Sequence, residues 1–114
     1  MKLTIKEDAF GDIQDWRDEI FIIRQHLEKQ LKFKFNKEIG MLTKRYRCKN
    51  GDAFLVLLGQ VRNPEPDFDK FYEVNVMFKH KNDEYFDGIL NRSGIDYICT
   101  LEDADRLDSY FKNI

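Results

Sequence analysis

Apolar and polar residues alternate on both sides of an Asn-Gly pair near the middle of the chain, which predicts two β-strands. Asn50-Gly51 is a preferred pair for a two-residue type I′ turn, in which both residues need a positive φ. The pairs expected from this turn are Lys49 with Asp52, Cys48 with Ala53, Arg47 with Phe54, Tyr46 with Leu55 and Arg45 with Val56. The pattern therefore predicts an antiparallel hairpin.

The two faces of this hairpin differ in character, because successive side chains of a strand point to opposite sides. One face is apolar and is expected to join the core: Leu42, Tyr46, Cys48, Ala53, Leu55 and Leu57. The other face combines cations with two apolar residues: Arg45, Arg47, Lys49, Phe54 and Val56. We expect this second face to be a surface of the protein.

Apolar residues at intervals of three and four predict an amphipathic helix in the first third of the chain. Its apolar positions are Ile13, Trp16, Ile20, Ile23, Leu27 and Leu31. The same spacing predicts a short C-terminal helix through Leu101, Ala104, Leu107, Phe111 and Ile114. Thr100 followed by Asp103 resembles a capping box, which favours a helix start at this point.

Tyr72–His80 has the most regular alternation in the chain and is predicted to be a strand. Shorter strands are expected at residues 85–90, interrupted at Gly88, and at residues 95–99; residues 32–35 fit either a strand or a helix that continues to Gly40. The connections between strands are too short for crossover helices, so the sheet should be a meander.

These elements predict one α+β domain over residues 1–114. A long N-terminal amphipathic helix would pack on a mainly antiparallel meander sheet of four to five strands, followed by the short C-terminal helix. We expect an exposed sheet edge near residues 85–90, because Gly88 weakens the strand there.

The composition indicates a folded protein: 42% of the 114 residues are hydrophobic, enough for a core without disulfides or metals. The net charge of −2 does not favour nucleic-acid or membrane-surface binding. No apolar run approaches the roughly 20 residues that span a bilayer, and the N-terminus lacks the apolar core of a signal peptide. We therefore expect a cytoplasmic protein without membrane contact.

Motifs of known chemistry are missing from the sequence. Cys48 and Cys99 occupy apolar-face positions and are expected to be buried thiols in a reducing compartment. No phosphate-binding glycine loop, nucleophile elbow, zinc spacing or calcium loop occurs. The expectation is no cofactor, no metal and no assigned catalytic residue. His80, at a strand end, is a better general-base candidate than His26, which lies beside the apolar stripe of a helix.

Two acidic clusters are candidates for binding a basic partner, which such clusters attract and select. The first cluster surrounds a proline loop and contains Glu65, Asp67, Asp69 and Glu73, and the second contains Glu102, Asp103, Asp105 and Asp108. Binding of a divalent cation, acid–base work, a favourable interaction with a helix dipole, and ordinary solvated surface are the alternatives. Phe68 and Phe71 beside the first cluster are typical of protein-binding hot spots.

Three functional hypotheses follow. The first is a non-catalytic protein-binding module: by analogy of size, charge and architecture, a small cytosolic inhibitor or immunity-type protein of bacterial or phage origin. Its partner would be a toxin, a nuclease or a defence or effector protein. The predicted binding residues are Glu65, Asp67, Phe68, Asp69, Phe71, Glu102, Asp105 and Asp108.

The second hypothesis is a small-molecule-binding domain or small enzyme. Its pocket would lie between the helix and a curved sheet, with His80, Glu73 and Tyr46 as polar groups.

The third hypothesis is a nucleic-acid binder. It would use a basic strand with one aromatic residue, through Arg45, Arg47, Lys49 and Phe54. The competing interpretation is that Glu73 and Asn75 neutralise this row while Arg47 stacks on Phe54.

Overall fold

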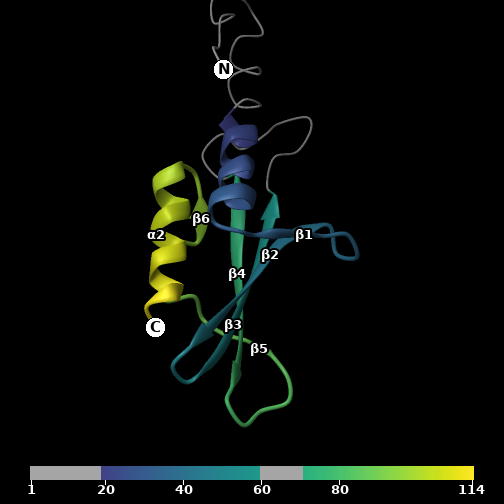
Figure 1. Cartoon of the computed structure of the whole chain (residues 1–114), viewed down its shortest axis with the longest axis vertical. Coiled ribbons are helices and arrows are strands. Elements are labelled where there is room, and N and C mark those ends of the chain that lie inside the picture. The colour runs from purple at the N-terminus through teal and green to yellow at the C-terminus, as the bar shows by residue number, and fades with distance from the viewer. Residues whose placement is uncertain (1–18, 60–70) are drawn as a thin grey trace, which may run out of the picture.

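The computed structural model describes residues 19–59 and 71–114. Residues 19–25 are α-helical and continue into a π-helix. The elements that follow in Figure 1 are η1 (His26–Gln30), β1 (Lys34–Asn36), β2 (Met41–Cys48), β3 (Gly51–Gly59), β4 (Tyr72–His80), β5 (Asp87–Gly88), β6 (Tyr97–Ile98) and α2 (Leu101–Lys112). The class is α+β, as predicted.

The strands form one antiparallel sheet in the order β1-β2-β3-β4-β5, and β6 also pairs with β4. This order confirms the predicted meander from β1 to β5, but the sheet has six strands where four to five were expected, and β6 lies off the meander path. The strands expected at 85–90 and 95–99 shrink to the two-residue strands β5 and β6, both paired with β4. At the other end of the sheet, β1 pairs only with residues 41–43 of β2.

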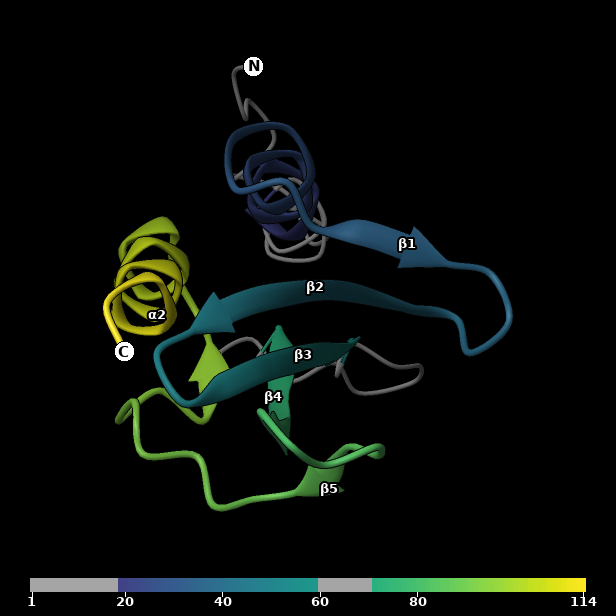
Figure 2. The ribbon, with the colours of Figure 1, turned by 60° about the horizontal axis from the view of Figure 1, so that its bottom comes forward.

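In Figure 2 the helical segment lies above β2 and α2 lies beside the end of β2, whereas β5 lies below β3, at the far border of the sheet. One hydrophobic core fills the space between these helices and the sheet. Its largest fully buried side chains are Phe71, Leu27, Leu55, Leu57, Ile98 and Leu107.

The prediction of a long N-terminal helix is not supported by the described residues. The helix over residues 19–30 is short, although Ile23 and Leu27 are buried as predicted. The hydrogen bond from Leu31 N–H to His26 O, at 3.0 Å, closes a wider π turn, and Lys32 has a φ of 67° that ends the helical path. The chain then turns into β1, so the helix does not continue to Gly40. The predicted contact of Trp16 lies outside the described residues.

The predicted register of the central hairpin is wrong by two residues. Arg47 pairs with Asp52 instead of Phe54, and the two-residue turn contains Lys49 and Asn50. Because the displacement is even, it leaves every side chain on its predicted face, and Tyr46 is buried as expected.

Gly51 explains this register. It belongs to β3, where its φ is 157° and it pairs with His80 of β4. A side chain at this position would collide with the backbone of Lys79 and His80. Glycine is therefore required by the close approach of β4 and not by a type I′ turn.

The predicted capping box at the start of α2 is confirmed. Thr100 Oγ1 accepts a hydrogen bond from Asp103 N–H at 3.1 Å, and the Asp103 carboxylate accepts one from Cys99 N–H at 2.9 Å. The Asp103 carboxylate therefore binds the N–H of the residue that precedes the N-cap Thr100, and not the N–H of Thr100 itself.

We expect Thr100→Ala to lower the free energy of unfolding by about 1 kcal/mol, because one helix N–H loses its partner. Urea unfolding measures the change. Thr100→Ser keeps the hydroxyl and should recover most of the loss; equal destabilisation by both substitutions would contradict a capping role.

Candidate functional site

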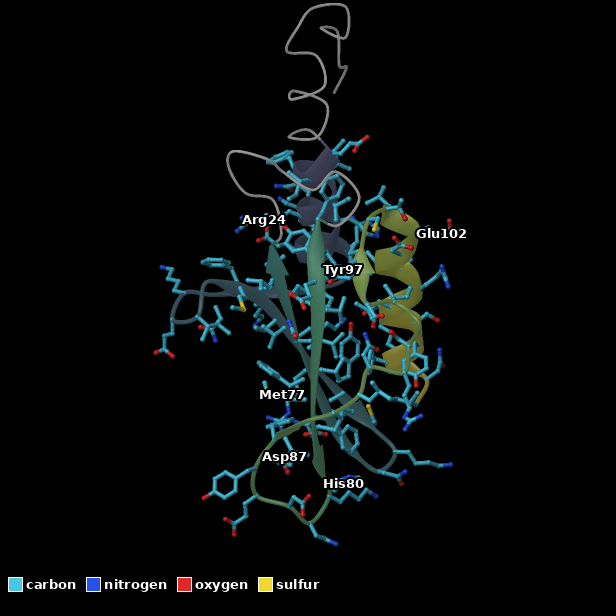
Figure 3. The ribbon with its side chains drawn as sticks, turned by 180° about the vertical axis from the view of Figure 1, so that it is seen from behind. Arg24, Met77, His80, Asp87, Tyr97 and Glu102 are labelled. Carbon is cyan, nitrogen blue, oxygen red and sulfur yellow. The ribbon has the colours of Figure 1, made fainter. Side chains whose placement is uncertain are left out.

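Few residues of the predicted acidic surface are both described by the structure and accessible to a partner. Glu65, Asp67, Phe68 and Asp69 lie outside the described residues. Phe71 is 1% exposed in the core and Asp108 is 4% exposed, so neither is accessible to a partner. Glu102 and Asp105 are exposed on α2, and Figure 3 shows Glu102 near the start of this helix. Asp105 Oδ1 lies 2.6 Å from His26 Nε2, so this acid already has a partner, and His26 is the boundary residue that we expected.

Asp108 is the centre of a polar network between α2 and β2. Its Oδ1 accepts hydrogen bonds from Tyr46 OH at 2.6 Å and from Lys44 Nζ at 2.9 Å, and its Oδ2 lies 3.0 Å from Lys112 Nζ. Lys44 Nζ also donates to the carbonyl of Leu31 at 2.6 Å and lies over the Tyr46 ring. The network therefore joins α2, β2 and the end of the first helix.

The buried carboxylate of Asp108 is compensated by cations within this network. Burial alone would raise the pKa of Asp108, but hydrogen bonds from Tyr46, Lys44 and Lys112 outweigh burial and lower this pKa below its ordinary value. Burial and the bond to Asp108 raise the pKa of Tyr46, so the phenol stays protonated. Since both oxygens of Asp108 have partners, we interpret this group as a structural anchor and not as a catalytic site.

The basic row of the hairpin is partly neutralised, by a residue other than the expected ones. Arg45 Nε lies 2.9 Å from Asp52 Oδ2, and hydrogen bonding to Arg45 lowers the pKa of Asp52. The Arg45 guanidinium lies over the ring of Phe86, whose centroid is 5.8 Å from that of Phe54. The ring of Phe54 thus packs against Phe86, and the predicted stacking of Arg47 on Phe54 is wrong. This surface is a weaker platform for nucleic-acid bases than the sequence indicated.

A groove of about 540 Å³ opens where the end of β4, the loop after β5 and the end of α2 meet. We call it the terminal groove. Its lining residues are Asn50, Phe78, His80, Ile89, Leu90, Arg92, Tyr110, Phe111 and Ile114. Figure 3 shows His80 at the end of β4, far from Glu102 at the other end of α2.

Most of the terminal groove is apolar, and part of this apolar surface is open to water. Leu90 is 70% exposed, Ile89 is 46% exposed and Ile114 is 41% exposed. Tyr110 and Phe111 contribute two rings in an edge-on contact, with centroids 5.0 Å apart. Clustered exposed apolar side chains of this kind mark interaction sites on soluble domains.

The loop that forms one wall of the groove is held by its own hydrogen bonds. Asn91 Nδ2 donates to the carbonyl of Ile95 at 2.8 Å, and Asn91 Oδ1 accepts from Ser93 N–H at 3.0 Å and from Ser93 Oγ at 2.7 Å. Ile89 N–H donates to the carbonyl of Val76 in β4 at 3.1 Å. These bonds fix the backbone on both sides of Leu90. The loop therefore loses little conformational entropy when a partner binds.

His80 and Arg92 are the basic side chains of the groove, and both are exposed. The His80 ring packs edge-on against Phe78, with centroids 4.8 Å apart. Among residues 19–59 and 71–114, neither His80 nor Arg92 has an ion pair or a side-chain hydrogen bond. They are available to a ligand or partner.

The sequence pattern indicated one residue of this site, His80, and did not indicate the others. Glu73 and Tyr46, the other polar groups expected in a pocket, do not line the groove. The missed signal was Ile89-Leu90, an apolar pair beside a glycine in a segment too short for a buried strand. Two adjacent apolar residues outside a predicted helix or strand indicate that their side chains are exposed to solvent.

Cysteine and metal chemistry receive no support in the described part of the chain. Cys48 and Cys99 are not joined by a disulfide, and burial raises the pKa of the Cys48 thiol. No cluster of three or more His, Cys, Asp or Glu side chains suitable for a metal occurs within residues 19–59 and 71–114. Over the same residues, no helix has the length and apolarity to span a membrane.

Comparison with protein-family models, with curated protein sequences and with solved structures found no match to this chain.

Proposed function

We propose that the chain is a non-catalytic protein-binding module whose main docking surface is the terminal groove. The observation that carries the proposal is the cluster of exposed apolar side chains around Leu90 on a loop held by Asn91. Complete burial of one leucine side chain contributes about 1.5–3 kcal/mol. A few such residues on a preorganised wall are sufficient for a specific interface.

The size of the chain and its few candidate catalytic groups support a proposal for the kind of partner. We propose a small cytosolic inhibitor or immunity-type protein, bacterial or phage in origin, which neutralises a toxin, a nuclease or another effector by binding it. Glu102 and Asp105 would add an acidic margin at the far end of α2, and the contributions of Glu65, Asp67, Phe68 and Asp69 stay predictions.

A second candidate function is the binding of a small molecule, because the volume of the groove falls in the usual range for ligand pockets, about 300–1,000 Å³. His80 at the rim would be its polar contact. Against this candidate, ligand pockets enclose most of their ligand, whereas Leu90 in the groove wall is 70% exposed.

The test compares two exposed residues from the same region of the chain. Leu90 lines the groove, whereas Tyr85 is 77% exposed and does not line it. Immobilised wild type and Tyr85→Ser should capture the same stoichiometric protein from extracts of the native host. Leu90→Ser should bind this protein about tenfold more weakly, a loss of about 1.4 kcal/mol.

Thermal unfolding of both variants should match that of the wild type, since both side chains are exposed. Equal binding by Leu90→Ser and Tyr85→Ser would rule out the groove as the docking surface. A small molecule retained in native mass spectra, without any stoichiometric protein, would favour the second candidate.

A further inference from the structure

We infer that the terminal groove binds a protein segment of a partner that combines apolar side chains with a neighbouring Asp or Glu. Arg92 binds the carboxylate of this acidic residue. The inference rests on the proposed protein-binding function and specifies the chemistry of the partner. It is carried by the juxtaposition of exposed apolar residues with a cation, Arg92, that has no ion pair among the described residues.

Among the described side chains that line the groove, Arg92 is the one with a permanent charge. The lining contains the guanidinium of Arg92 and the imidazole of His80, together with the neutral amide of Asn50, and no carboxylate side chain. Elsewhere in the described residues, three exposed arginines form ion pairs with carboxylates, and exposed Arg47 does not: the pairs are Arg24–Glu28, Arg45–Asp52 and Arg106–Asp103. Arg92 has no such pair there. An acidic group of a partner would therefore complement this wall and would displace no existing contact.

The position of Arg92 relative to Leu90 defines the arrangement of the partner. The two residues flank Asn91, whose side chain is held by Ser93 and Ile95, and both line the groove. An apolar side chain resting on Leu90 therefore has its carboxylate neighbour within reach of Arg92. The guanidinium offers two parallel N–H groups to a carboxylate, and apolar neighbours reduce the screening of this pair by water.

Backbone hydrogen bonds hold the rest of the rim in place. The turn residue Lys49 donates its N–H to the carbonyl of Ile114 at 3.2 Å, and Lys81 N–H donates to the carbonyl of Asn50 at 3.1 Å. These bonds fix the hairpin turn and the ends of β4 and α2 around the groove. Both lysine side chains are exposed at this end, and so are Asp83 and Glu84 of the turn after β4. The rim therefore carries charges of both signs, and Arg92 provides the cation in the groove wall.

A library of random short peptides displayed on phage tests the inference. Peptides selected on the wild type should combine aliphatic or aromatic residues with Asp or Glu at a constant spacing. On Arg92→Gln the apolar preference should persist and the acidic preference should disappear. Arg47→Gln is the matched control, because Arg47 is an exposed arginine on the opposite face of the hairpin and does not line the groove.

One selected peptide and its Glu→Gln or Asp→Asn counterpart then give a double-mutant cycle, measured by fluorescence anisotropy. Removing the peptide carboxylate should weaken binding to the wild type about tenfold, which corresponds to about 1.4 kcal/mol, and should have little effect on Arg92→Gln. High salt should reduce the difference.

An acidic preference that survives in Arg92→Gln, or selected peptides without acids, would overturn the inference. A library that yields no groove-dependent peptide, while a medium-chain fatty acid binds, would overturn it as well. Capture of a natural partner that depends on Leu90 but not on Arg92 would leave the proposed function standing and remove the inference. If acidic peptides need Arg92 for binding but no stoichiometric natural partner is captured, the inference about Arg92 would stand and the proposed function would be removed.

Discussion

Asp108→Ala is expected to lower the free energy of unfolding by roughly 3 kcal/mol, because it removes the anion from a buried network of hydrogen-bonded charges. Lys44 would keep only its bond to the carbonyl of Leu31, and the Tyr46 hydroxyl would lose its acceptor. Lys44 is 16% exposed, so some water can reach the stranded charge, which keeps the loss at the lower end of the usual range.

The matched control is Asp105→Ala on the same helix, since the Asp105 side chain is 56% exposed and its pair with His26 lies at the surface. Urea unfolding should show a loss of about 1 kcal/mol or less for this control. If the two substitutions had equal effects, the anchor interpretation of Asp108 would be incorrect.

The same network has a consequence for acid stability. The pKa of Asp108 is lower in the folded protein than its ordinary value, so its stabilising contribution is complete above the ordinary value and is lost as the pH falls through the folded value. The unfolding free energy of the wild type should therefore fall more steeply below about pH 4 than that of Asp108→Ala. Urea unfolding over this acidic range measures both slopes.

Gly51→Ala is the second substitution with a large expected effect, a loss of roughly 3 kcal/mol in unfolding free energy. The new Cβ would collide with the backbone of Lys79 and His80, and the φ of 157° is unfavourable for a residue with a side chain. Backbone atoms of a central strand cannot move aside without breaking the pairing of β3 with β4. Urea unfolding measures the loss.

Gly88→Ala provides the comparison, because Gly88 also lies in a strand paired with β4 and a Cβ there would have no neighbour within 4 Å. Its effect should stay within about 0.5 kcal/mol. If Gly51→Ala were as mild as Gly88→Ala, the close approach of β4 would not be the reason for glycine at position 51.

The faces of the strands and the cap of α2 could be predicted because they depend on neighbouring residues. Alternation placed Tyr46 and Leu55 in the core, and the spacing of Thr100 and Asp103 located the helix start. The hairpin register depended on a contact with β4, which is distant in sequence, so local turn preference gave the wrong answer at Asn50-Gly51. The end of the first helix was missed for a related reason, since the path into β1 is set by a single residue with a positive φ, Lys32.

The candidate site was harder to predict than the fold. The groove exists because residues from β4, the loop after β5 and α2 meet in space, and no spacing in the sequence encodes that meeting. The burial of Asp108, in contrast, could have been foreseen. It shares one helical face with Ala104, Leu107 and Phe111, and an acid inside an apolar stripe indicates a buried, paired carboxylate.

Because β1 is short, the part of β2 beyond residue 43 pairs with β3 on one border and has no partner strand on its other border in the described parts of the chain. Open strand borders invite copies of a protein to join into fibrils. Here the exposed residues along this border include Arg47, which has no ion pair among the described residues and whose charge would face its counterpart in an approaching copy. Crowded chains should therefore repel one another along this border, and a high concentration of salt should weaken that protection.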